Sequence, residues 1–129
     1  MLAAVAERLD ARSEELGVSR NHLLERYVDE GLRRDKHPLV YFREAASGRR
    51  PALLGTRLDV WQVIETVRAE SGSVAAAAGY LGQPEAKVAA AVSYYAEFKE
   101  EIDAFAERAK QAAEEAETAW RREREAFRS

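Results

Sequence analysis

The spacing of apolar residues first predicts two helices at the N-terminal end of the chain. Leu2, Val5, Leu9 and Leu16 recur at helical intervals over residues 2–16, and Gly17 follows as a C-terminal cap. A second helix is expected to begin after Ser19, whose hydroxyl can accept from a free backbone N–H, and to end near residue 34. Its apolar stripe consists of Leu24, Val28 and Leu32, with Leu23 and Tyr27 beside them. The pattern predicts an N-terminal helix pair over residues 1–36.

The pattern changes at Pro38. Residues 39–43 and 51–54 are short β-favouring runs, and the turn-like sequence Ala-Ser-Gly at 46–48 separates them. A small β-hairpin is expected in this region.

Three more helices are expected after the hairpin. Asp59 and Gln62 have the spacing of a capping box, and Val60, Val63, Ile64 and Val67 give the third helix its apolar stripe. Ser73 can cap a fourth helix that ends at Gly82, and Pro84 suits the first turn of a fifth. The fold class predicted is therefore mainly α, with a helix pair, a short hairpin, a helix-turn-helix core and a long C-terminal helix.

Residues 85–129 contain neither glycine nor proline. One helix over this whole stretch would be about 68 Å long at about 1.5 Å per residue, which exceeds what a domain of this size can cover. Part of the stretch must project, bend or bind a partner. We expect three zones: the helix pair (1–36), the hairpin with the helix-turn-helix (37–103), and a charged C-terminal helix (104–129).

Composition narrows the classes of function. The 129 residues include no cysteine, which excludes disulfide scaffolds and thiol chemistry, and the net charge of −3 is unlike that of a general polyanion binder. No leader and no apolar run of membrane length occurs, so we expect a cytoplasmic protein.

The chain also lacks the minimum parts of a catalytic or metal site. His22 and His37 have no acidic neighbours at metal-ligand spacing, and no phosphate loop or nucleophile pattern occurs. Glu100, Glu101 and Asp103 fit a solvated or structural helix face better than a catalytic pair. We expect no enzyme activity, no cofactor and no metal.

The segment over residues 74–93 has the spacing of a helix-turn-helix. Such a motif needs a small residue where the helices touch, a turn residue that tolerates positive φ, and a branched apolar residue on the second helix; Ala78, Gly82 and Val88 meet these needs. Among the positions of the second helix expected to be exposed, Lys87 is the one basic residue. Readout of DNA bases usually relies on Arg, Lys, Asn or Gln, so a purely structural helical hairpin remains an alternative.

Several residues are candidates for DNA contact. On the second helix these are Lys87 and Ser93, and the hairpin region adds a basic group that could lie on phosphates as a wing does, namely Arg43, Arg49, Arg50 and Arg57. A solvated face is the alternative, because Glu44 and Asp59 partly neutralise this group.

About half of the chain resembles a widespread small prokaryotic domain. The resemblance lies in PALLGTRLDV at residues 51–60, in Gly72-Ser73-Val74, and in VSYYAEFKEEID at residues 92–103. Proteins of that family are commonly antitoxins paired with PIN-type ribonuclease toxins. Members that carry an added N-terminal segment, as this chain does, resemble the VapB group. The resemblance implies binding rather than catalysis, with Gly55 and Thr56 structural and Arg57 pinning the turn or touching a partner.

Two departures from that family bear on structure. Asp59 stands where the family has an apolar residue or proline, which favours a better-capped third helix. Lys99 stands near a common proline position, which favours a smoother run into the tail.

The N-terminal portion also resembles the two helices of a ribbon-helix-helix repressor, through LGVSRNHLLERYV at residues 16–28. That fold reads DNA with a strand ahead of its first helix, and only Met1 and Leu2 precede the helix in this chain. Either the true start lies upstream, or the helix pair serves dimerisation without a DNA ribbon.

Residues 104–129 are the candidate toxin-binding segment. A narrow, alanine-rich apolar stripe makes a lone helix marginal in water, so docking would order it. Its expected anchors and cations are Phe105, Trp120, Arg121, Arg122, Arg124 and Phe127. An arginine entering the nuclease site would neutralise the carboxylates that hold Mg²⁺; a solvated charged end is the alternative.

Three classes of function stay open. The first is an antitoxin that binds a PIN-type ribonuclease toxin and operator DNA, with a homo-oligomer as its expected form. The second is a stand-alone helix-turn-helix transcription regulator. The third is a structural dimerisation or adaptor protein.

Overall fold

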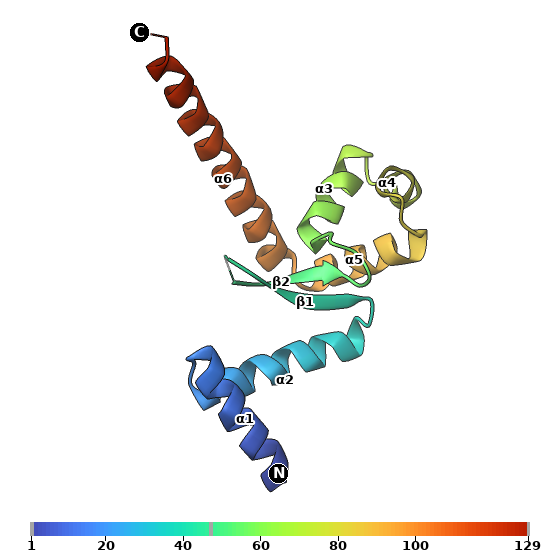
Figure 1. The fold of residues 1–129 in the computed structure, drawn as a ribbon. Coiled ribbons are helices and arrows are strands. Elements are labelled where there is room, and N and C mark those ends of the chain that lie inside the picture. Colours follow the sequence, from blue (N-terminus) through green and yellow to red (C-terminus); the bar gives the residue numbers. More distant parts are fainter. Residues whose placement is uncertain (1, 47, 129) are drawn as a thin grey trace. The chain divides into compact units, whose positions relative to one another are not determined.

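The structure is a computed structural model that describes residues 2–46 and 48–128. This part of the chain forms six helices and one two-stranded hairpin, which are labelled in Figure 1. The elements are α1 (Ala3–Leu16), α2 (Arg20–Lys36), β1 (Val40–Ala45), β2 (Gly48–Leu53), α3 (Val60–Ala69), α4 (Val74–Leu81), α5 (Glu85–Glu97) and α6 (Lys99–Ala126). The mainly helical fold class predicted from the sequence is confirmed.

The chain divides into two compact units, Met1–Pro38 and Leu39–Ser129. Because α6 runs unbroken past residue 104, the C-terminal segment continues a helix of the second unit. None of the helices in the described residues combines the length and the apolar character needed to cross a membrane.

The first unit consists of α1 and α2. Gly17 caps α1 with a left-handed φ of 66°, and the Ser19 hydroxyl accepts from the His22 amide at 3.1 Å, as the sequence predicts. The expected stripe of α2 is largely uncovered: Val28 and Leu32 are exposed and Leu24 is half-buried. The fully buried side chain is that of Leu23, which was expected beside the stripe. The apolar spacing therefore identifies a helix face, most of which remains open to solvent.

The second unit begins with the β1–β2 hairpin. The strands are antiparallel, with Val40 opposite Leu53 and Glu44 opposite Arg49. β2 begins at Gly48, three residues before the predicted start, because the pairing extends through polar residues that a search for β-favouring runs overlooks. The predicted turn includes Ser47, which lies outside the described residues.

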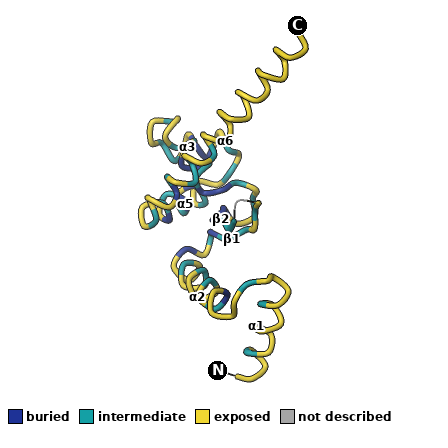
Figure 2. Tube along the Cα trace, turned by 90° about the vertical axis from the view of Figure 1, so that its left-hand side faces the viewer, coloured by how far each residue is buried: buried dark blue, intermediate teal, exposed yellow. Residues whose placement is uncertain are grey.

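The hydrophobic core of the second unit lies between the hairpin and α3, α4, α5 and the start of α6. Tyr94 is fully buried at its centre, with its ring centroid 6.5 Å from that of Phe42 and 4.6 Å from that of Phe98. In Figure 2 buried segments gather around β2, α3 and α5, whereas α6 is exposed along its far part.

The helical corner formed by α4 and α5 matches the sequence prediction. The Ser73 hydroxyl accepts from the Ala76 amide at 3.0 Å, and Gly82 ends α4 with a φ of 65°. Ala78 and Val88 are both buried. The α4–turn–α5 segment is thus a helix-turn-helix in geometry.

The expected smooth run from α5 into the tail is wrong. The helix is interrupted at Phe98, whose φ of −120° and ψ of 39° lie outside the helical region. The change of direction allows Ile102, which is 1% exposed, to enter the core, and Phe105 packs against the same core. Tertiary packing therefore outweighs local helix propensity at this residue.

Candidate functional site

Asp59 is a buried carboxylate at the junction of the hairpin and α3. It is 2% exposed, and its backbone amide donates to the Gln62 side chain at 2.8 Å within the predicted capping box. Asp59 Oδ1 accepts from Arg43 Nε at 2.6 Å, and Oδ2 accepts from the Trp61 indole at 3.1 Å. The capping box expected from the sequence is present at the start of α3.

The same carboxylate neutralises two of the arginines expected to contact DNA. The hydrogen bond to Asp59 raises the pKa of Arg43, and Arg50 Nε lies 3.2 Å from Asp59 Oδ2. A third arginine, Arg49, forms an ion pair with Glu44 across the hairpin at 3.2 Å. Three of the four candidate phosphate contacts are thus held by carboxylates of the chain itself.

The fourth, Arg57, belongs to the Gly-Thr-Arg turn after β2. Gly55 has a φ of 77°, and the Thr56 hydroxyl donates to the Leu53 carbonyl at 2.8 Å and accepts from the Leu58 amide at 3.0 Å. Gly55 and Thr56 therefore shape the turn. Arg57 is exposed and forms no ion pair among the described residues, so its side chain remains available to a partner.

Lys87 supports this turn instead of facing solvent on the outer side of α5. Its Nζ donates to the Leu54 carbonyl at 3.0 Å. A Cβ placed on Gly55 would lie 3.2 Å from the same nitrogen, so the residue without a side chain leaves room for the contact. Lys87 is half-buried and links α5 to the turn.

The exposed face of α5 therefore differs from the one expected. It consists of Glu85, Ala86, Ala89, Ser93, Ala96 and Glu97. Ser93 is exposed as predicted, but this face carries two acidic side chains and no basic one. An acidic face repels phosphate, so α5 lacks the positive charge that base readout by this helix would use.

The proximal part of α6 carries a polar cluster that holds it against α3 and α5. The Tyr95 hydroxyl donates to Asp103 Oδ1 at 2.8 Å, and Lys99 Nζ donates to Oδ2 at 3.2 Å. Arg68 Nη2 donates to the Tyr95 hydroxyl and lies 3.4 Å from Asp103 Oδ1. The hydrogen bond from Tyr95 lowers the pKa of Asp103. The contacts of Asp103 with Tyr95, Lys99 and Arg68 make it a structural anchor of α6.

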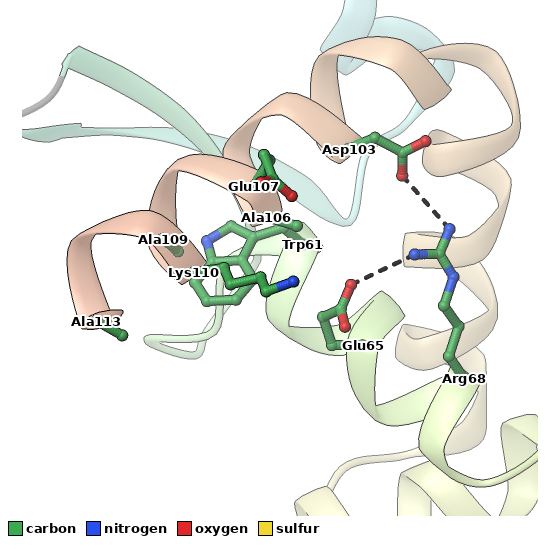
Figure 3. A pocket seen from close by; sticks show the side chains of 9 residues that line it. All are labelled: Trp61, Glu65, Arg68, Asp103, Ala106, Glu107, Ala109, Lys110 and Ala113. Carbon is green, nitrogen blue, oxygen red and sulfur yellow. Dashed lines mark hydrogen bonds and ion pairs between the residues drawn. The ribbon is translucent and has the colours of Figure 1, made fainter. Parts of the chain in front are cut away.

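A groove of about 540 Å³ lies between α3 and α6 beside this cluster (Figure 3). It is lined by Trp61, Glu65, Arg68, Asp103, Ala106, Glu107, Ala109, Lys110 and Ala113. The sequence reasoning missed this groove. The signal available was the spacing of Ala106, Ala109 and Ala113, small residues on one helix face that leave space beside the indole of Trp61.

The candidate toxin-binding residues occupy two different environments along α6. Phe105 packs against the core, with Arg108 lying 4.7 Å from its ring centroid. Residues 110–128 are all exposed, and the exposed fraction is 55% for Trp120 and 92% for Phe127. The apolar residues that lack a covering surface are therefore at the distal end.

The distal arginines are only partly engaged within the helix. Arg124 lies 4.6 Å from the Trp120 ring centroid, and Arg121 Nη2 is 2.5 Å from Glu117 Oε1. Both contacts lie within one helical turn and at the surface, where such pairs contribute little to stability. Arg122 is exposed beside them. All three guanidinium groups are accessible to a partner.

The first unit offers a second apolar surface. Exposed apolar side chains of α1, α2 and the residue preceding α1 are Leu2, Val5, Leu16, Tyr27, Val28 and Leu32. A hollow of about 390 Å³ between the two helices has an apolar lining flanked by Arg8 and Arg12.

No protein-family model, curated protein or solved structure matches this chain. Among the described residues, no group of three or more His, Cys, Asp or Glu side chains is arranged to hold a metal ion. The surfaces themselves must therefore support any functional assignment.

Proposed function

We propose that the protein is a cytoplasmic antitoxin that binds and neutralises a PIN-type ribonuclease toxin through the distal part of α6. The observation that carries the proposal is the exposure of residues 110–128, a segment that nevertheless contains Trp120 and Phe127. Large aromatic side chains with adjacent arginines are typical anchors of protein interfaces. A helix that buries so little apolar surface by itself gains most of its stability from docking.

The chemistry of the proposed partner follows from these side chains. Trp120 and Phe127 would enter apolar depressions on the toxin, and Arg121, Arg122 and Arg124 would face the carboxylates of a metal-dependent nuclease site. Guanidinium groups pair with carboxylates in two-pronged hydrogen bonds, which displaces Mg²⁺ from the same oxygens. Inhibition then results from the loss of the metal and from steric occlusion.

Co-expression with a neighbouring PIN-type reading frame, read out by growth and pull-down, tests this proposal. We expect wild-type protein to rescue growth and the Trp120→Ala/Phe127→Ala variant to lose both rescue and capture. Gln111→Ala/Thr118→Ala, two exposed changes in the same helix, is the matched control and should rescue. Full rescue by Arg121→Ala/Arg122→Ala/Arg124→Ala would contradict the role assigned to the arginines.

The second part of the proposal is autoregulation through operator DNA. Arg57 is exposed beside the hairpin, whereas α5 exposes Glu85 and Glu97, so contact with phosphate is better supported than base readout. Binding to the promoter is expected to weaken steeply with salt and to discriminate poorly against a scrambled fragment. If the protein does not bind DNA even at low salt, autoregulation is contradicted and the role of a structural dimerisation or adaptor protein is favoured.

A homo-oligomer is the expected form of this antitoxin. The first unit has 38 residues, and its buried apolar side chains among those described are Leu9 and Leu23. A unit this small usually needs oligomerisation or covalent links, and the chain has no cysteine. A second copy covering Val28 and Leu32 would supply the missing burial.

A further inference from the structure

We propose that α5 and α6 open into one continuous helix and that two copies of the chain thereby exchange α6 in a domain-swapped dimer. The interruption between the two helices is a single residue, Phe98, with α5 ending at Glu97 and α6 beginning at Lys99. Sharp helix breaks usually coincide with proline or glycine, and residues 85–129 contain neither. The break is therefore held by packing, which a second copy can supply equally well.

The contacts that hold α6 in place would all be available between copies. Ile102 enters the core, and Asp103 accepts from Tyr95 of α5 and lies within reach of Arg68 of α3. In an exchanged dimer the α6 of one copy would make these same contacts with the core of the other. Closed and exchanged forms thus bury the same side chains, which is the usual basis of domain swapping.

Opening the hinge need not break the backbone hydrogen bonds of Phe98. Its amide donates to the Tyr94 carbonyl at 3.0 Å, and its carbonyl accepts from the Ile102 amide at 3.1 Å. A continuous helix keeps both bonds, because each joins residues four positions apart. Association costs translational and rotational freedom, so the exchanged dimer should increase with protein concentration.

An intrachain distance measurement tests this proposal. Ala89→Cys and Glu115→Cys place nitroxide labels on exposed positions of α5 and α6, in a chain that has no other cysteine. Labelled protein is diluted into an excess of unlabelled protein, so pulsed electron paramagnetic resonance reports distances within one chain. The 26 intervening steps of a continuous helix correspond to about 39 Å, and the bent form gives a shorter distance.

We expect the fraction of molecules with a distance near about 39 Å to increase when the protein is refolded at increasing concentration. Lys99→Pro should abolish it, because proline is tolerated at the first position of α6 but disrupts the interior of a continuous helix. Lys99→Ala is the matched control: it also removes the contact with Asp103 but should retain the long distance.

A single short distance at every concentration in the labelled chain that retains Lys99 would overturn the proposal, as would a long distance that persists in Lys99→Pro. Apart from the two cysteines at exposed positions, this measurement requires no variant to fold. Because the readout lies within one chain, dimerisation through the first unit does not affect it. It requires neither a toxin nor DNA, so it can fail or succeed independently of the proposed function.

Discussion

The first eleven residues of α6, Lys99 to Ala109, pack beside α3, while the remainder of the helix is exposed. Both parts have apolar residues at intervals of three and four. In the proximal part, Ile102 is buried and Asp103 is held by Tyr95 and Lys99. In the distal part, Trp120 and Phe127 have no covering surface among the described residues. Periodicity defines a helix face, but an adjacent element decides whether the face contributes to stability.

The largest expected effect contrasts these two parts directly. Ile102→Ala should lower the free energy of unfolding by about 2–5 kcal/mol, because it removes a fully buried side chain and leaves a cavity. Trp120→Ala should change it by no more than about 0.5 kcal/mol despite the larger side chain, because the residue is mostly exposed. Chemical denaturation of both variants measures the difference. Equal losses would mean that the distal helix is covered within the free protein.

A smaller effect is expected at the junction of the hairpin and α3. Asp59→Ala removes the partner of Arg43, Arg50 and the Trp61 indole, and should cost about 1–3 kcal/mol. The loss stays below that of a fully buried pair because both arginines can reach water. Asp59→Ala should also strengthen DNA binding at low salt, since two guanidinium groups become available. Unchanged DNA affinity would remove the hairpin arginines from the binding surface.

The smallest effect concerns the pH dependence of the proximal anchor. The pKa of Asp103 is lowered from its ordinary value near 3.8 by the hydrogen bond from Tyr95, so its contribution is present at neutral pH. That contribution should decline as the pH falls below about 4, through the lowered pKa of the folded state. The stability difference between wild type and Asp103→Asn should therefore shrink in acid. A difference that grows in acid would contradict the sign of this linkage.

Local chemistry allowed much of the fold to be predicted. Ser19 and Ser73 cap their helices, Gly17 and Gly82 end theirs in the left-handed conformation, and the capping box at Asp59 is present. These interactions involve residues within one turn of each other, so sequence spacing is sufficient to identify them. The helix-turn-helix geometry was predictable for the same reason.

The candidate site was less predictable, because its key contacts join distant parts of the chain. Arg43 and Arg50 were candidates for phosphate contact, yet both lie beside Asp59, and Lys87 donates to the Leu54 carbonyl. The groove between α3 and α6 also combines residues more than 40 positions apart. Which charges remain free is a property of tertiary neighbours, and spacing along one helix does not contain it.

The amino-acid sequence by itself determined where helices begin and end in most of the chain, because caps, turn glycines and apolar periodicity act over a few residues. It also determined that the charged segment after residue 104 is helical, as α6 shows as far as Ala126. Only the tertiary structure decided that the helix breaks at Phe98 and that α5 exposes no basic side chain. Those outcomes depend on which surfaces meet in the core, and burial there outweighs local propensity.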